Sequence, residues 1–217
     1  NNDGCVVSRS NEAKTLGIPM GRPLFDCKDI VERFNITVFS SNFALYGDIS
    51  ARVMKILSYF AEDIEIYSID EAFLSLEKTL MEDPLVYAKK IKETILKYTG
   101  VPVSIGLGRT KTLAKAASKI AKKQTDGTFF ITEENKKNYL SKFSAIDIWG
   151  IGYKSSNKLK QIGIFTAADF LNAEKNIIKK IMGVTGERIW LEISGISSIP
   201  ISFQQKTKHG ILNSRSF

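Results

Sequence analysis

The chain has 217 residues, of which 43% are hydrophobic and 25% are charged, and these proportions are typical of globular proteins. No apolar run approaches the roughly 20 residues that cross a bilayer, so a membrane partner is not expected. The single histidine, His209, argues against histidine-based catalysis. Because Cys5 and Cys27 lack the spacing of metal ligands, we interpret them as reduced thiols of a cytosolic protein.

The net charge of +8 is unevenly distributed along the chain. Residues 1–40 are neutral, with 5 basic and 5 acidic side chains, whereas residues 41–83 carry 3 basic and 9 acidic ones, a charge of −6. Residues 84–126 carry 10 basic and 2 acidic side chains (+8), and residues 127–217 carry 13 and 7 (+6). The basic segments are either solvated lysine faces or a surface that holds a polyanion while the acidic segment holds cations.

The apolar spacing and the turn residues predict, in chain order, a helix over 49–60, strands over 64–69 and 72–76, a helix from Pro84 to Gly100 capped by Asp83, a strand over 101–105, a helix over 111–123 and a strand over 128–131. With one strand in front, this order becomes βαββαβ, the ferredoxin-like arrangement. Because residue 1 is not Met and the first residues read as the middle of a fold, we expect a portion of a longer protein. Residues 133–198 predict short helices joined by glycine turns, and residues 199–208 predict a linker.

Two adjacent carboxylates, Asp70 and Glu71, interrupt the apolar stretch YSIDEAF. In a regular strand they would point to opposite faces, but at a hairpin tip, anchored by Ile69 and Phe73, both can converge on one point. Their oxygens suit Mg²⁺, and paired Mg²⁺ ions are a common device for in-line phosphoryl transfer. The alternative is a solvated turn, since Asp is a good turn residue.

The stretch SIGLGRTKTLAKAASKIAKK, residues 104–123, predicts a strand, a glycine turn and a helix. A stripe of lysines follows one side of this helix at spacings of four, four and three, and comprises Lys111, Lys115, Lys119 and Lys122. The helix start after Gly-x-Gly could bind phosphate, although it lacks the third glycine of a dinucleotide site and the spacing of a P-loop. An exposed lysine-rich face explains the stripe equally well.

The stretch WGIGYK places Gly150, Gly152 and Lys154 between two short predicted helices, in the pattern of a helix-hairpin-helix element. Such glycines expose backbone N–H groups that can contact DNA phosphate without reading sequence. The stretch GVTG, residues 183–186, is a weaker second candidate, and an ordinary αα-hairpin is the alternative for both. By itself the hydroxyl-rich segment SRSNEAK, residues 8–14, indicates only a helix start at the surface.

Together, the segments NNDGCVVSRSNEAKTLGIPMG, FSSNFALYGDIS, YSIDEAF, GLGRTKTLAKAASKIAKK, WGIG and NSRSF resemble the Y-family translesion DNA polymerases, most closely the bacterial UmuC-like branch of the ImpB/MucB/SamB type. The resemblance implies an α+β fold, with a ferredoxin-like palm that lacks its first strand, small fingers and an all-α helix-hairpin-helix thumb. It places the fingers at 1–40, the palm at 41–132, the thumb at 133–198 and a linker into an absent little finger at 199–217.

The resemblance also implies a catalytic and metal-binding role for Asp70 and Glu71, which would hold two Mg²⁺ ions. The third carboxylate of the family and its steric-gate aromatic residue would precede residue 1. The remaining matches are Ser8, Lys14 and Lys122 for the incoming triphosphate, Asn11 where other branches have a phosphate-contacting tyrosine, and Gly150, Gly152 and Lys154 for DNA. From the lysine stripe we also expect Lys111 and Lys115 to contact DNA.

The implied function is template-directed, error-prone DNA synthesis across damage, in which dNTPs extend the primer of a primer–template DNA in the bacterial cytoplasm, at the nucleoid. The fragment alone is expected to be inactive, and any sliding clamp or UmuD-like accessory subunit would bind regions outside it. One alternative is a non-catalytic DNA-binding scaffold in a repair complex. Another is a nucleotidyl cyclase, against which the hairpin-bearing tail argues, since a cyclase needs no element that follows a duplex.

Overall fold

The computed structural model describes residues 4–77 and 83–202, and contacts divide the chain into two compact units, the first ending at Asp48 and the second beginning at Ile49. The elements up to the boundary are α1 (Asn11–Thr15), the 3-10 helix η1 (Leu24–Cys27), α2 (Lys28–Arg33) and α3 (Phe43–Leu57), which crosses it. The elements beyond it are β1 (Asp63–Ile66), β2 (Ala72–Ser75), α4 (Pro84–Thr99), β3 (Ile105–Gly108), α5 (Lys111–Ala121), β4 (Thr128–Ile131), α6 (Glu133–Lys142), η2 (Ala145–Asp147), α7 (Tyr153–Gln161), α8 (Ala167–Asn172) and α9 (Lys175–Ser194).

The first unit packs around a small core of three buried residues, Ala13, Ile18 and Cys27. Four partly buried side chains cover this core, namely Val6, Ile30, Val31 and Ile36. Its division from the second unit falls after Asp48, eight residues beyond the boundary that the sequence suggested at residue 40. Cys5 is exposed, and both cysteines are free thiols.

Most of the predicted elements are confirmed, because their ends carry clear local signals. The Asp83 carboxylate accepts a hydrogen bond from the Leu85 N–H at 2.7 Å, and α4 ends at Gly100 with φ of 72°. Two starts were predicted wrongly by four residues or more, and the ends of α3, β1 and β3 were each predicted wrongly by three residues. α3 begins six residues early, at Phe43, because the Asn42 side chain caps it by accepting from the Leu45 N–H at 3.0 Å.

The second wrong start concerns the strand predicted over 101–105, since β3 begins only at Ile105. Pro102 has no N–H to contribute to a ladder, and this disfavours strand pairing around it. β3 then runs parallel to β4, from the pair Ile105 and Thr128 to the pair Gly108 and Ile131.

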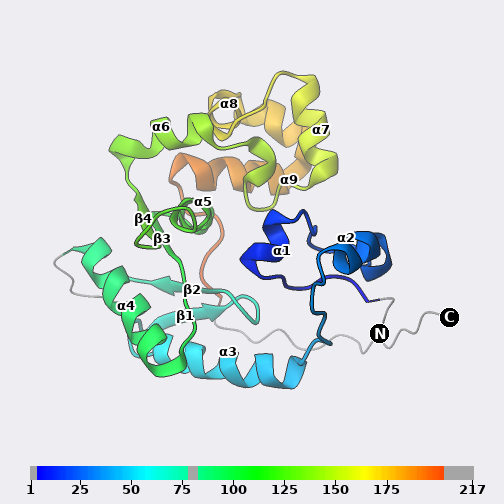
Figure 1. The fold of residues 1–217 in the computed structure, drawn as a ribbon. Coiled ribbons are helices and arrows are strands. Elements are labelled where there is room, and N and C mark those ends of the chain that lie inside the picture. The colour runs from blue at the N-terminus through cyan, green and yellow to red at the C-terminus, as the bar shows by residue number, and fades with distance from the viewer. Residues whose placement is uncertain (1–3, 78–82, 203–217) are drawn as a thin grey trace. The chain divides into compact units, whose positions relative to one another are not determined.

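β1 and β2 form the predicted hairpin, antiparallel from the pair Asp63 and Ser75 to the pair Ile66 and Ala72. Within residues 4–77 and 83–202, the four strands form two separate two-stranded sheets, β1–β2 and β3–β4 (Figure 1). The architecture is therefore mixed helix and strand with small sheets. The single ferredoxin-like sheet that the sequence suggested is not formed by the described strands alone. No helix among the described residues is long and apolar enough to span a membrane.

α5 lies directly on the backbone of β3, and two glycines make this approach possible. A Cβ atom on Gly106 would lie 2.0 Å from the backbone nitrogen of Ser118, and one on Gly108 would lie 2.6 Å from that of Ala114. Main-chain contact therefore fixes the position of α5, and with it the row of lysines that α5 carries.

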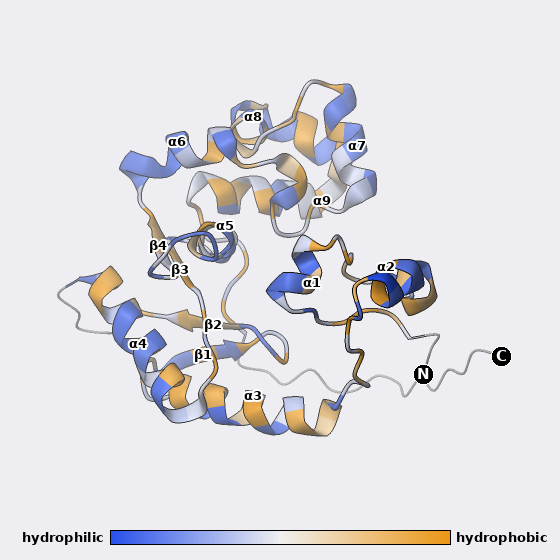
Figure 2. Cartoon of the chain, in the orientation of Figure 1, coloured by the Kyte–Doolittle hydropathy of each residue, from blue (hydrophilic) through white to orange (hydrophobic). Residues whose placement is uncertain are grey.

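The main core of the second unit joins α5 and β4 to the helices that follow. Its sixteen buried members are Leu113, Ala116, Ala117, Ile131, Leu140, Phe143, Ala145, Ile148, Ile151, Leu159, Ile164, Ala167, Phe170, Ile178, Ile189 and Ile193. This core crosses residue 133, where the sequence suggested that a thumb begins. Figure 2 shows α6 as a mostly hydrophilic helix. It nevertheless contributes one buried apolar residue, Leu140, to this core.

Candidate active site and nucleic-acid interface

The loop between β1 and β2 carries the predicted carboxylates Asp70 and Glu71. The backbone N–H groups of Tyr67 and Ser68 both donate to the Glu71 carbonyl, at 3.0 and 3.1 Å, and close the loop. The Ser68 hydroxyl donates to Asp70 Oδ1 at 2.6 Å. Asp70 is exposed, whereas Glu71 is partly buried. The sequence therefore placed the carboxylates correctly at a hairpin tip.

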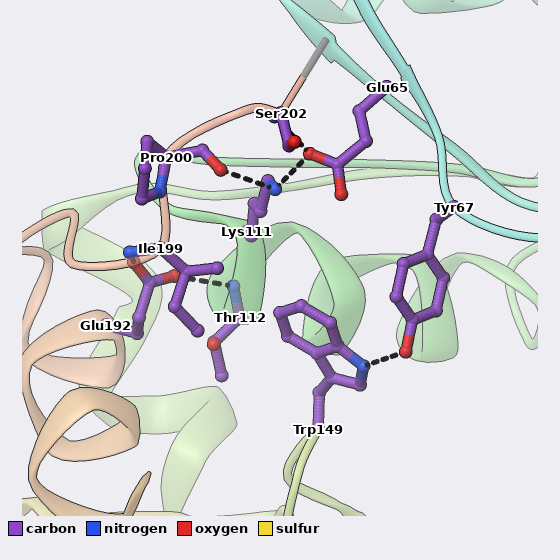
Figure 3. Close-up of polar contacts among 9 residues, drawn as sticks. All are labelled: Glu65, Tyr67, Lys111, Thr112, Trp149, Glu192, Ile199, Pro200 and Ser202. Atoms are coloured by element: carbon purple, nitrogen blue, oxygen red, sulfur yellow. Dashed lines mark hydrogen bonds and ion pairs between the residues drawn. The ribbon is translucent and has the colours of Figure 1, made fainter. Parts of the chain in front are cut away.

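The side chains that anchor this hairpin differ in part from those expected. Phe73 is buried as predicted, but Ile69 is 49% exposed, so the prediction that Ile69 anchors the loop is wrong. The second anchor is instead Trp149, whose ring centroid lies 5.5 Å from those of both Tyr67 and Phe73. Its indole Nε1 also donates to the Tyr67 hydroxyl at 3.4 Å, as Figure 3 shows. Trp149 thus joins the carboxylate hairpin to the segment that carries Gly150 and Gly152.

Three lysines of α5, spaced four residues apart, each contact a carboxylate on a different element. Lys115 Nζ lies 2.5 Å from Glu71 Oε1, and 5.8 Å from the centroid of the Tyr67 ring. Lys111 pairs with Glu65 on β1, and Lys119 pairs with Asp147 in η2. The acidic and basic sequence blocks therefore meet along α5. Lys122, which follows the helix, is exposed.

Lys111 corrects the interpretation of the stripe as one exposed face, because it is buried with 8% exposure. Its ammonium contacts Glu65 and donates to the Pro200 carbonyl at 2.8 Å. Glu65 Oε2 also accepts from the Ser202 N–H at 2.6 Å. Figure 3 shows Lys111 between these groups. The burial of this ammonium counts against the contact with DNA that the lysine stripe suggested for Lys111.

A second carboxylate, Glu192 of α9, holds the same segment and was not singled out from the sequence. It is fully buried, and its Oε1 accepts from the N–H groups of Ser198 at 2.7 Å and Ile199 at 3.0 Å. Its Oε2 accepts from the Thr112 N–H in the first turn of α5, at 3.0 Å (Figure 3). Residues 198–202, which we term the strap, are therefore fastened to α5 and β1. The rest of the linker predicted over 199–217 lies outside the described residues, as do His209 and the NSRSF segment.

The two loop carboxylates offer hard oxygen ligands of the kind that divalent cations such as Mg²⁺ prefer, and Asp70 is exposed to receive one. In this respect the residues fit a divalent metal ion. Among residues 4–77 and 83–202, however, no group of three or more His, Cys, Asp or Glu side chains is placed to hold a metal. The loop therefore supplies part of a coordination sphere.

The turn before α7 contains the predicted phosphate-binding glycines. Gly150 has φ of 91°, and a Cβ atom there would lie 2.9 Å from Ile189 Cδ1, so the fold itself requires glycine. Gly152 differs, because its φ is ordinary and a Cβ atom there would meet no atom of the described residues within 4 Å. Gly152 is the N-cap of α7 without a side-chain cap, which leaves the N–H groups of the first turn, including that of Lys154, without such an acceptor. The α7 start can thus accept an external anion.

The second candidate hairpin, GVTG, lies inside α9. Gly183 has φ of 68° and ψ of −158°, which interrupts the helix. A Cβ atom on Gly186 would lie 2.4 Å from the Cβ of Met182. The glycines of this segment are explained by the turn and by close packing inside the protein.

The predicted triphosphate residues of the N-terminal segment lie in the first unit. Ser8, Asn11 and Lys14 are all exposed, and Lys14 Nζ donates to Asn11 Oδ1 at 3.1 Å. Ser10 caps α1 by accepting from the Ala13 N–H at 3.2 Å. The roles of these residues stay predictions.

Comparisons with known proteins show the family to which this chain belongs. A sequence profile described as the impB/mucB/samB family matches residues 1–119. The chain belongs to this family. It is 40% identical to Protein UmuC of Salmonella typhimurium over 222 residues, which cover 100% of this chain and 53% of that protein. It is also 36% identical to DNA polymerase IV of Picrophilus torridus, over 83% of this chain and 51% of that protein.

Among solved structures, an insertion ternary complex of Dbh DNA polymerase is similar, with a TM-score of 0.78 and 27% identity over 92% of this chain and 58% of that one. The chain thus spans about half the length of the curated relatives named above. These similarities confirm the family resemblance that the motifs suggested.

The sequence interpretation missed Trp149 as an anchor of the hairpin and Glu192 as the holder of the strap. A signal for Glu192 does exist, since it is the single charge in the apolar stretch IWLEIS. A lone carboxylate on an apolar helix face is seldom buried without hydrogen-bond donors. No comparable signal identified its donors, which lie 80 residues away at Thr112 and beyond the helix end at Ser198.

Proposed function

We propose that this chain is the central part of a translesion DNA polymerase that uses two Mg²⁺ ions to add dNTPs to a primer 3′-OH. The observation that carries the proposal is the exposed Asp70–Glu71 loop, locked through Trp149 to the Gly150–Gly152 turn. Trp149 thereby joins the loop that we propose as the metal site to the turn that we propose as the phosphate site. Similarity to proteins named UmuC and DNA polymerase IV supports the same function.

In this proposal the β1–β2 hairpin, α4, β3 and α5 belong to a ferredoxin-like palm. Residues 1–40 would be the fingers, and the α6–α9 helices would be the helix-hairpin-helix thumb. The palm needs one strand more than the described residues provide, and that strand would join the β1–β2 and β3–β4 sheets into one. We place it, together with a third carboxylate, in the portion of the longer protein outside this chain.

Asp70 and Glu71 would hold the divalent ions, which when bound lower the pKa of the attacking hydroxyl and stabilise the leaving pyrophosphate. The loop geometry keeps the two carboxylates at the surface, where a primer end can approach. Ser68 orients Asp70 through its hydroxyl. The remaining contribution of the chain is positioning, which can supply a large part of the barrier reduction in phosphoryl transfer.

Exposed basic and hydroxyl groups would bind the triphosphate of the incoming nucleotide. We assign this role to Lys122 beyond α5 and to Ser8, Asn11 and Lys14 of the fingers. The contact between Lys14 and Asn11 supports a shared role for these two. Asn11 stands where other branches have a tyrosine, so it would contribute by orienting Lys14.

DNA would contact the N-terminal turn of α7. An external phosphate approaching Gly152 is the simplest reason for a glycine at a position where the protein itself leaves space. Lys154 adds positive charge to the same turn. Lys115 is a further candidate DNA contact, whereas buried Lys111 is better explained as an anchor of the strap. A sliding clamp and a UmuD-like subunit would bind outside this chain.

Primer extension by the complete protein tests this function. With Mg²⁺, dNTPs and a primer–template, Asp70→Ala should abolish extension while duplex affinity, measured by fluorescence anisotropy, stays unchanged. Gly152→Val should weaken duplex binding. Gly47→Val in α3 serves as a control, because Gly47 also has an ordinary φ and a Cβ atom there would meet no described atom within 4 Å. Extension at the normal rate by Asp70→Ala would show that this loop is not the metal site.

A second candidate function is a DNA-binding scaffold without catalysis. It is favoured for this chain by one observation, that the described residues hold no cluster of three metal ligands. The scaffold function predicts that the chain binds duplex DNA but shows no saturable uptake of dNTP when Mg²⁺ and dNTP are titrated together.

A further inference from the structure

Among the residues that the structure describes, the Glu71 carboxylate is held by a lysine and not by backbone donors. Its Oε1 lies 2.5 Å from Lys115 Nζ, and the two side chains are 36% and 25% exposed. This exposure leaves the pair accessible to ions from solvent. Coulomb attraction between partly exposed charges is moderate, so a competing cation of higher charge can break such a pair.

The neighbouring lysines of α5 are committed to other carboxylates. Lys111 is paired with Glu65, and Lys119 with Asp147. Asp70 in turn accepts from the Ser68 hydroxyl. Within the described part of the chain, Lys115 is therefore the cation that α5 directs at the candidate metal loop.

We propose that Lys115 is a positioning residue that serves as an exchangeable counter-ion of Glu71. Its ammonium group pairs with the Glu71 carboxylate until a divalent cation binds there and displaces it. The inference rests on the proposed function, in which Glu71 is a metal ligand. It assigns to Lys115 a role distinct from contact with DNA: to hold the glutamate in place and to weaken metal binding to the unliganded loop.

The surroundings of Lys115 allow the exchange. The face of the Tyr67 ring lies 5.8 Å from its ammonium, so a cation–π contact persists when the carboxylate turns to a metal. Tyr67 itself is fixed by Trp149, with ring centroids 5.5 Å apart. The displaced ammonium stays close to the bound cation, and the repulsion between the two positive charges lowers the affinity of the site.

Direct metal titration tests the proposal without any activity measurement. Mn²⁺ serves as the probe, and free Mn²⁺ is followed by its electron paramagnetic resonance signal at low ionic strength. Removing the competing charge in Lys115→Gln should tighten Mn²⁺ binding by about 3- to 10-fold, as expected for the loss of one nearby positive charge. Lys115→Arg, which keeps the charge, should bind Mn²⁺ like the wild type. Circular dichroism confirms that each variant is folded.

The matched control is Lys119→Gln, one helical turn further along, because its partner is Asp147 and not Glu71. It loses the same charge and should leave Mn²⁺ affinity unchanged within about 2-fold, since a charge one turn further away is screened. In the double variant Lys115→Gln/Glu71→Gln the tightening should disappear.

Equal Mn²⁺ affinity in Lys115→Gln and the wild type, with both depending on Glu71, would overturn the role of Lys115 and leave the proposed metal site intact. Weaker binding in Lys115→Gln would also overturn it, because it would show that the lysine supports the site structurally. Mn²⁺ binding that is insensitive to Glu71→Gln in every variant, or absent from all of them, would overturn both the role of Lys115 and the assignment of the loop as a metal site.

Discussion

Glu192 and Glu71 are two carboxylates of the same unit with opposite kinds of partner. Glu192 is fully buried and accepts three hydrogen bonds from backbone N–H groups that the fold holds fixed. Glu71 is partly exposed and pairs with the flexible side chain of Lys115. Glu65 is intermediate, since it accepts from Lys111 and from the Ser202 N–H. Fixed donors suit a carboxylate that holds the fold together, and an exchangeable partner suits one that must bind something else.

The largest effect is expected from Glu192→Ala, because it leaves three N–H groups without their acceptor in a buried site. At about 1–3 kcal/mol for each unsatisfied buried group, partly relieved by water, the loss in unfolding free energy should be roughly 3 kcal/mol or more. Urea denaturation measures this loss. Glu187→Ala on the same helix, whose partners are the lysines Lys175 and Lys179, is the control and should lose far less. Similar losses for the two variants would contradict the distinction between fixed and exchangeable partners.

Lys111→Met should have an intermediate effect. It removes the cation from a mostly buried pair and leaves Glu65 with one charged partner fewer, which should cost about 2 kcal/mol. Lys119→Met, which breaks a pair whose side chains are 45% and 36% exposed, should cost no more than about 0.5 kcal/mol. The two unfolding midpoints in urea provide the measurement. A Lys111→Met variant as stable as Lys119→Met would show that the strap does not depend on its lysine.

Glu71→Gln should change the unfolding free energy by less than about 0.5 kcal/mol, because its pair with Lys115 is exposed to solvent. In the complete protein the same change should abolish primer extension. Glu192 is therefore expected to be needed for stability, whereas Glu71 is expected to be needed for activity. A Glu71→Gln variant that is strongly destabilised would remove this contrast.

The smallest effect concerns pH. Hydrogen bonds from the backbone and hydroxyl of Thr166, and from the backbone N–H of Phe165, lower the pKa of Asp169 below its ordinary value. A carboxylate with a lowered folded-state pKa stabilises the fold above the unfolded pKa of about 3.9, and this contribution is lost as the pH falls through the folded value. Asp169→Asn should therefore lose less stability than the wild type between pH 5 and pH 2, measured as the shift of the urea midpoint. Equal losses of stability in the wild type and in Asp169→Asn would contradict the lowered pKa of Asp169.

Local signals were sufficient to predict much of the fold. Asp83, Pro84 and Gly100 delimit α4 in the sequence as they do in the structure, and the β1–β2 hairpin follows from its alternating pattern. The start of α3 was misplaced because Asn42 and Asp48 are equally good caps by type, and only the folded chain shows which one is used.

The candidate site was predicted less completely, because burial depends on contacts between distant residues. Lys111 and Lys122 are alike in type and both belong to the predicted stripe, yet the first is buried and the second exposed. They differ because Glu65 and the strap pack against the start of α5. Glu65 lies 46 residues before Lys111 in the sequence, and Pro200 of the strap lies 89 residues after it. No spacing rule along a helix contains that information.

The close contact between α5 and β3 has a consequence for how this protein can change over evolutionary time. Gly106 and Gly108 leave no side chain between α5 and β3, so the backbones are in direct contact. Substitutions elsewhere in the core should therefore shift the axis of α5 very little. The position of the Lys115 ammonium group should therefore stay the same when residues of the surrounding core are substituted. An exposed lysine such as Lys119 can therefore be exchanged without moving the helix, because the backbone beneath keeps each position in place.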